Sequence, residues 1–157
     1  MLKLPIKVKN LEFFDKGKRS LIYTGFYKNK KLAIKLKNPK SNAKNRISNE
    51  AKYLKFLNKY LIGPKLISSN KNCVIYEFVE GKRLKDVLSK KTLNLCFEAG
   101  KCIGKMHSGN LIHGDLTRSN VLVRKNNTGK SKKNDNELVM IDFGLSTFSH
   151  KLEDAAV

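Results

Sequence analysis

The sequence predicts an α+β fold in two lobes, a five-stranded N-terminal sheet followed by a reduced helical C-terminal part. Short β-type segments bounded by turn residues fill residues 10–37 and 65–78, with one helical pattern between them. Beyond residue 84 the apolar residues mostly recur at helical spacing. Because 157 residues suffice for one substantial core, we expect a single domain over 1–157, with an N-terminal lobe at 10–80 and a partial C-terminal lobe at 81–157.

Each element expected in the N-terminal lobe follows from its local pattern. Apolar segments with turn residues on both sides predict five strands, at 11–14, 21–27, 32–36, 65–68 and 73–78. A helix over about 42–60 is predicted because Ile47, Ala51 and Leu54 recur every three or four residues. Gly63-Pro64 is expected to end that helical unit.

The C-terminal lobe is expected to combine helices with short strands. A short helix is predicted at 84–88, followed by a longer one that Thr92 caps. Apolar runs predict further strands, at 111–112, 121–123 and 138–141. The stretch 124–137 is polar and of low complexity, which predicts a mobile insert between two strands.

Two short motifs lie beside these strands. Residues 113–120 read H-x-D-x-x-x-x-N, and residues 142–144 read D-F-G. Phosphoryl transfer needs a group that faces the acceptor oxygen and oxygen ligands for Mg²⁺. We therefore expect Asp115 to be the catalytic base or orienting carboxylate, and Asn120 and Asp142 to bind the metal. In this order the two motifs are typical of the catalytic loop and metal loop of the protein-kinase-like fold, whose two lobes share one cleft.

Such a cleft needs groups that hold the phosphates of ATP. The turn Gly17-Lys18-Arg19-Ser20 keeps one of the three usual glycines, yet it offers backbone N–H groups, a hydroxyl and two cations. An ordinary hairpin turn is the other interpretation. Ile22 takes the place of the valine that follows the glycine loop of a protein kinase. Lys35 is expected to reach the α- and β-phosphates, with Glu50 on the predicted helix as its partner.

The adenine ring is expected to lie between Ala33 and Leu122. Glu77 and Val79 stand where an apolar strand runs into a glycine, and we expect their backbone groups to be free for the adenine edge. A plain edge strand and ordinary core residues are the alternatives. His113 is expected to pack beneath the metal loop and to hydrogen-bond the backbone.

Composition limits the partners of the chain. Lys and Arg number 33 against 13 acidic residues, a net charge of +20, which favours nucleotide phosphates, RNA or an acidic partner. A solvated lysine-rich surface is the other interpretation. Cys73, Cys96 and Cys102 lack metal-ligand spacing and are expected to be reduced core residues of an intracellular protein. No apolar run approaches a membrane-spanning length, so no membrane association is expected.

The stretch H-G-D-L-T-R-S-N-V-L at 113–122, together with I-D-F-G-L-S at 141–146, resembles one family. It is the small atypical kinase/ATPase of the KEOPS (EKC) complex, which is related to RIO kinases. Gly114 and Thr117 distinguish this pattern from that of typical protein kinases. The resemblance implies ATP hydrolysis or non-specific Ser/Thr phosphorylation with Mg²⁺, in support of threonylcarbamoylation of tRNA adenosine. It also implies the same roles for the site residues that the motifs predict: Asp115, Asn120, Asp142, Lys35 and Glu50.

The same resemblance implies other KEOPS subunits as partners, above all the threonylcarbamoyl transferase, with tRNA as a further candidate. It implies a cytoplasmic location, or also the nucleus for a eukaryotic source. Family members continue beyond Glu153-Asp154 with helices and a basic tail. This chain is therefore expected to be C-terminally truncated, with the apolar side of Leu95, Ile103 and Met106 uncovered.

Three other functions stay open. A RIO-type kinase of ribosome assembly fits the polar turn at Gly17, although D-F-G is unusual for that group. A small-molecule kinase of the aminoglycoside or choline type shares H-G-D-x-x-x-x-N, but it needs a large helical lobe that this chain has no sequence to build. The third is a non-enzymatic binding module, a truncated kinase-like protein that holds tRNA or a partner through its charge.

Overall fold

The N-terminal part of the protein is an antiparallel sheet. The computed structural model describes residues 3–17, 19–42, 45–125 and 136–149. Its five strands are β1 (Lys9–Lys16), β2 (Ser20–Tyr27), β3 (Lys30–Lys37), β4 (Leu66–Asn70) and β5 (Cys73–Glu77). They pair in the order β1-β2-β3-β5-β4. The predicted five-stranded sheet is therefore confirmed.

Helix α1 (Arg46–Leu57) crosses from the sheet to the C-terminal part, and a 3-10 turn, η1 (Asn58–Tyr60), extends it. It is shorter than the helix expected over 42–60. Gly63 follows with a φ of +76°, and a Cβ there would lie 2.9 Å from the Phe143 ring and 3.0 Å from Leu54. Glycine at this position therefore allows the chain to turn close against both side chains.

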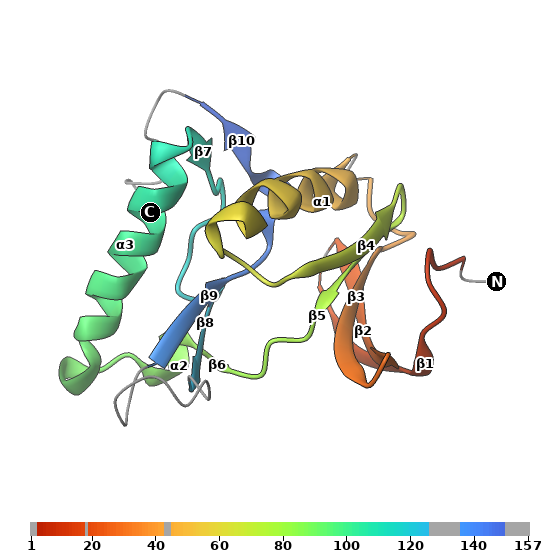
Figure 1. Cartoon of the computed structure of the whole chain (residues 1–157), viewed down its shortest axis with the longest axis horizontal. Coiled ribbons are helices and arrows are strands. Elements are labelled where there is room, and N and C mark those ends of the chain that lie inside the picture. Colours follow the sequence, from red (N-terminus) through yellow and green to blue (C-terminus); the bar gives the residue numbers. More distant parts are fainter. Residues whose placement is uncertain (1–2, 18, 43–44, 126–135, 150–157) are drawn as a thin grey trace.

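The C-terminal part is built from short strands and one long helix. Its elements are β6 (Lys82–Arg83), α2 (Leu84–Val87), η2 (Lys90–Thr92), α3 (Asn94–Ser108), β7 (Leu111–Ile112), β8 (Val121–Lys125), β9 (Asn136–Met140), η3 (Phe143–Leu145) and β10 (Thr147–Phe148). They form one sheet in the order β6-β8-β9 and a second pair, β10-β7. Figure 1 shows α3 at the far left of the molecule, the five-stranded sheet at the right and α1 extending between them.

The two parts share a hydrophobic core around α1. Leu54 and Leu57 of α1 pack in one buried cluster with Met106 of α3, Leu111 of β7 and Phe143 of the metal loop. A second cluster lies within the sheet. The shared core holds α1 against the metal loop.

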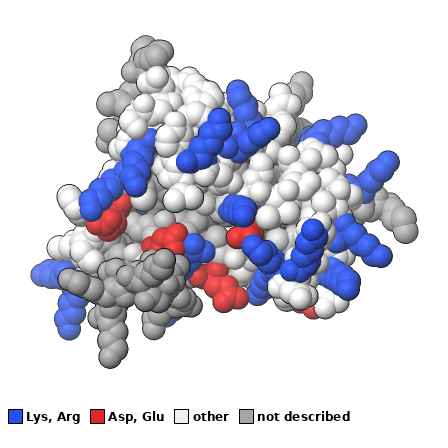
Figure 2. Space-filling view, in the orientation of Figure 1, with Lys and Arg blue, Asp and Glu red and all other residues white. Residues whose placement is uncertain are grey.

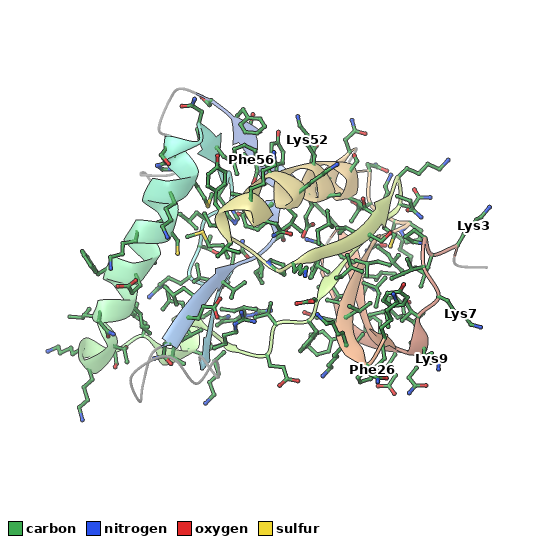
Figure 3. The ribbon with its side chains drawn as sticks, in the orientation of Figure 1. Lys3, Lys7, Lys9, Phe26, Lys52 and Phe56 are labelled. Atoms are coloured by element: carbon green, nitrogen blue, oxygen red, sulfur yellow. The ribbon has the colours of Figure 1, made fainter. Side chains whose placement is uncertain are left out.

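An aromatic contact adds to this anchorage on the other side of α1. Phe56 and Lys52, labelled in Figure 3, project from the side of α1 that faces away from the five-stranded sheet. The Phe56 ring lies 5.1 Å from the ring of Phe148 on β10, and Tyr53 lies 5.5 Å from the same ring. The helix is therefore held from two sides by the C-terminal part.

Three sequence-based expectations are wrong in detail. Thr92 does not cap α3; its hydroxyl closes a capping box with Ser89, and Leu93 precedes the helix without a side-chain cap. The expectation that α3 leaves an apolar side uncovered is wrong for Leu95 and Met106, which are only 2% and 1% exposed because they face the core shared with α1. Ile103 is partly exposed and lines a hollow. Cys96 is exposed rather than a core residue, since it lies on the outer side of the helix.

Lysine and arginine dominate the surface. On the face drawn in Figure 2 they are spread widely, whereas the few acidic side chains lie near the middle and at the left edge. No helix in the described ranges combines the length and apolar character that crossing a bilayer requires. Most of the polar stretch 124–137, Lys18 and Glu153-Asp154 lie outside the described residues.

Candidate active site

A buried lysine on β3, the central strand of the sheet, contacts two carboxylates. Lys35 Nζ lies 2.7 Å from Glu50 Oε2 and 2.7 Å from Asp142 Oδ1. Side-chain exposure is 8% for Lys35 and 2% for Glu50, against 42% for Asp142. The contact expected between Lys35 and Glu50 is present, and Asp142 joins it from a loop 107 residues beyond Lys35.

Burial and charge set the protonation of this trio. Burial opposes the charge of Lys35, but Glu50, Tyr76 and Asp142 together raise its pKa above the usual value. Complete burial raises the pKa of Glu50 in spite of the attraction to Lys35. Against the effect of burial, Lys35 lowers the pKa of Asp142. Asp142 is therefore anionic at neutral pH and available to a cation.

Hydrogen bonds tie the catalytic loop to the metal loop. His113 Nε2 lies 3.0 Å from the Ile141 carbonyl oxygen, and Ser146 Oγ donates to the His113 carbonyl at 3.0 Å. The N–H of Ile141 donates to the carbonyl of Asn120 at 2.9 Å. His113 is fully buried and packs against Phe143, with ring centroids 4.9 Å apart and the ring planes tilted by 47°. The expected structural place of His113, beneath the metal loop, is confirmed.

The catalytic loop turns sharply before Asp115. Gly114 has a φ of +76°, and a Cβ on it would overlap the carbonyl oxygen of Leu145. The chain can make this approach only with glycine at position 114 unless the metal loop moves. Asn120 Nδ2 donates to the Asp115 carbonyl at 2.8 Å and to Asp115 Oδ2 at 3.3 Å, which fixes the direction of the carboxylate.

A single hollow of about 160 Å³ collects the charged groups of both lobes. Lys35, Glu50, Asp115 and Asp142 all line it. Arg46, which the sequence analysis did not single out, lines it as well. Its position four residues before Glu50, and so on the same side of α1, is the signal that could have found it.

Other predicted ATP-binding residues lie at or near this hollow. Gly17, Arg19 and Ser20 are part of its lining. Ile22 pairs with Lys35 across the sheet, and Ala33 stands two residues before Lys35, so all three share one face. Leu122 lies half-buried on β8, directly after the catalytic loop.

The structure does not bring Glu77 and Val79 into this hollow. They line a separate and larger one of about 790 Å³. The N–H of Glu77 donates to the Lys65 carbonyl at 2.9 Å, and its carboxylate pairs with Lys30 at 2.7 Å. The expectation of a free Glu77 backbone is therefore wrong for the N–H, because the pairing of β4 with β5 already uses it.

The oxygen donors near the catalytic loop fit Mg²⁺. Asp142 is an ionised, partly exposed carboxylate. Asn120 commits its amide nitrogen to Asp115, which leaves its amide oxygen pointing away from that residue. The described residues contain no group of three acidic, His or Cys side chains that could hold a metal alone. Two protein oxygens completed by phosphate oxygens are the usual arrangement for Mg²⁺ with a nucleotide.

Comparison with known proteins agrees with this geometry. A family model described as "Protein tyrosine and serine/threonine kinase" matches residues 8–156. The KEOPS complex subunit Bud32 of Pyrococcus abyssi is 39% identical over 88 residues, which cover 54% of this chain and 36% of that protein. The EKC/KEOPS complex subunit BUD32 of Debaryomyces hansenii is 36% identical over 138 residues, which cover 74% of this chain and 49% of the relative. These names confirm the resemblance drawn from the motifs.

The chain spans at most about half the length of these relatives. A solved structure, the Rio2 kinase from Chaetomium thermophilum in a complex with ADP, Mg²⁺ and phosphoaspartate, superimposes with a TM-score of 0.73. It is 16% identical in sequence, and the match covers 91% of this chain and 49% of that one. At this identity the likeness shows the two-lobed kinase-like fold.

Proposed function

The chain belongs to the protein tyrosine and serine/threonine kinase family, and on that premise we propose that it uses Mg-ATP as a Ser/Thr protein kinase or ATPase of the KEOPS type. The observation that carries the proposal is the meeting of Lys35, Glu50, Asp115 and Asp142 in one hollow. A buried cation and carboxylates from both lobes are the groups that phosphoryl transfer needs.

Each residue has a distinct task in this proposal. Lys35, held by Glu50, binds the inner phosphates of ATP. Asp115 orients the acceptor, a hydroxyl group or a water molecule, and takes its proton as the new bond to the terminal phosphorus forms and the bond to the bridging oxygen breaks. Asn120 and Asp142 would hold Mg²⁺, which neutralises charge on the phosphates when bound.

The remaining assignments follow from position. Gly17, Arg19 and Ser20 border the hollow from the turn between β1 and β2, so they lie where the outer phosphates would be held. Ile22 and Ala33 share the sheet face of Lys35 and would contact the base, with Leu122 below it. The carbonyl of Glu77 and the backbone of Val79 remain candidates for hydrogen bonds to the edge of the adenine ring.

The proposal extends to partners because of what the relatives are named. Curated relatives include KEOPS subunits and a protein of tRNA threonylcarbamoyladenosine biosynthesis from Methanococcus vannielii. We propose that this chain assembles with the threonylcarbamoyl transferase and supports the modification of tRNA. A RIO-type kinase of ribosome assembly is the second candidate, favoured by the structural likeness to Rio2.

ATP hydrolysis by the full chain tests the proposal, measured with and without a transferase subunit. Asp142→Asn and Lys35→Met should each lower turnover by roughly a hundredfold or more, because charge stabilisation of the transferring group is lost. Asp86→Asn, which changes an exposed carboxylate on α2, is the matched control and should hydrolyse ATP like the wild type. Equal turnover in all proteins would contradict the site. Nucleotide binding without hydrolysis in either setting would support the non-enzymatic module.

A further inference from the structure

A second hollow, of about 200 Å³, adjoins the candidate active site and is lined by cations. Arg19, Lys37, Arg46 and Lys71 all border it. Arg19 and Arg46 also line the neighbouring hollow that contains Lys35. Among the described residues, no acidic side chain is part of the lining of this second hollow, which we call the cationic pocket. It is as large as the hollow in which the catalytic groups meet.

The fold brings these four cations together from four separate segments. Arg19 lies in the turn before β2, Lys37 ends β3, Arg46 begins α1, and Lys71 lies in the turn between β4 and β5. Backbone hydrogen bonds join three of the segments: the N–H of residue 38 donates to the Arg19 carbonyl at 3.1 Å, and the N–H of Lys37 donates to the carbonyl of residue 72 at 3.2 Å. The backbone therefore holds these segments next to one another, whatever conformations the long side chains adopt.

The described residues give the cationic pocket no carboxylate of its own. Within the described part of the chain, none of its four cations forms an ion pair with a carboxylate. Arg46 is half-buried, and burial and the nearby Arg19 lower its pKa, against the attraction of Asp142 and Asp115. Two guanidinium groups held close together repel each other, and a bound anion would remove that repulsion.

We propose that the cationic pocket binds a phosphate group, at a site separate from the one that Lys35 serves. Guanidinium groups bind phosphate with two parallel hydrogen bonds, and lysines add point charges. The first turn of the 12-residue helix α1 also borders the pocket, through Arg46, Ile47 and Ser48. Free oligophosphate and the backbone of RNA carry the same chemistry. The inference does not require that the adjoining hollow binds ATP.

Calorimetric titration of the full chain with inorganic pyrophosphate tests this site. The variant Lys37→Gln/Lys71→Gln removes two charges that line only the cationic pocket. The control Lys59→Gln/Lys105→Gln removes two exposed charges elsewhere. We expect pyrophosphate to bind roughly tenfold or more weakly to the pocket variant than to the control. Thermal unfolding of both variants would show that each remains folded, and equal pyrophosphate affinities would overturn the proposal.

Two further titrations separate the sources of phosphate and the two sites. Short single-stranded RNA that binds the pocket variant more weakly, with a salt slope reduced by about one, would identify a nucleic-acid backbone. If the pocket variant binds pyrophosphate more weakly but RNA as well as the control does, the ligand of the pocket is a free phosphate compound. ATP should bind the pocket variant and the control alike. If ATP binds neither variant nor the wild type, the proposed function fails while the pyrophosphate comparison still stands.

Discussion

The ion pair between Lys35 and Glu50 should matter for stability and for chemistry in separable ways. We consider Glu50→Leu, Lys35→Met and the double variant that carries both changes. The paired atoms are 2.7 Å apart, with side-chain exposures of 8% and 2%. Removing one partner of a buried pair leaves an uncompensated charge, which typically costs about 3–5 kcal/mol.

From the contacts of each residue we expect the two single variants to lose different amounts of stability within that range. In Glu50→Leu the lysine still contacts Asp142 at 2.7 Å, so the loss of stability should be near the lower end, about 3 kcal/mol. In Lys35→Met the described residues offer Glu50 no other cation within 4.0 Å, so the loss should be greater, about 4 kcal/mol. The double variant buries two apolar side chains of similar volume and should lie within about 1 kcal/mol of the wild type.

Urea unfolding followed by circular dichroism measures these differences, and ATP hydrolysis is measured on the same samples. All three variants should lose hydrolysis, including the stable double variant. Lys35→Met and the double variant lack the lysine that holds the inner phosphates, and in Glu50→Leu the lysine loses the carboxylate that positions it. Additive losses of stability, with the double variant less stable than either single variant, would refute the reasoning. Wild-type hydrolysis by the double variant would refute the assigned role of the pair.

Three further predictions address the backbone, the cysteines and pH. Gly114→Ala should destabilise the chain by roughly 2–4 kcal/mol through strain at φ +76° and overlap with the metal loop, whereas Gly100→Ala, in open space within α3, should stabilise it by about 1 kcal/mol. Thermal unfolding measures both, and shifts of the same sign would contradict the conformation of the loop. At about pH 8 iodoacetamide should label exposed Cys96 in the native chain and spare Cys73, whose buried thiol has its pKa raised to about 11. Mass spectrometry measures the labelling, and rapid modification of Cys73 would show that β5 opens. The lowered folded-state pKa of Asp142 means that its charge stabilises the fold above the ordinary aspartate pKa and ceases to do so as pH falls through the lowered value. The difference in unfolding free energy between the wild type and Asp142→Asn should therefore be constant from about pH 5 to 8 and disappear in stronger acid.

Local patterns alone predicted most of the elements and named the candidate site residues. The strands of the N-terminal sheet and helix α1 follow from apolar spacing, since each is stabilised by burying one face. Asp115, Asn120 and Asp142 could be named because their motifs bring the necessary side chains into two short loops. Glu50 could be paired with Lys35 because acids are scarce between residues 15 and 77.

Several other features of the fold and of the site were decided only by the tertiary structure. The hydrogen bond that occupies the Glu77 N–H, the burial of Leu95 and the exposure of Cys96 all depend on neighbours from other segments. Spacing places Arg46 on the Glu50 side of α1, but Arg46 lines the site because the metal loop and the turn at Arg19 pack beside it. Spacing along one helix or strand determines which of its residues share a face. The packing of the elements determines which side chains that face contacts, and this packing depends on residues from the whole chain.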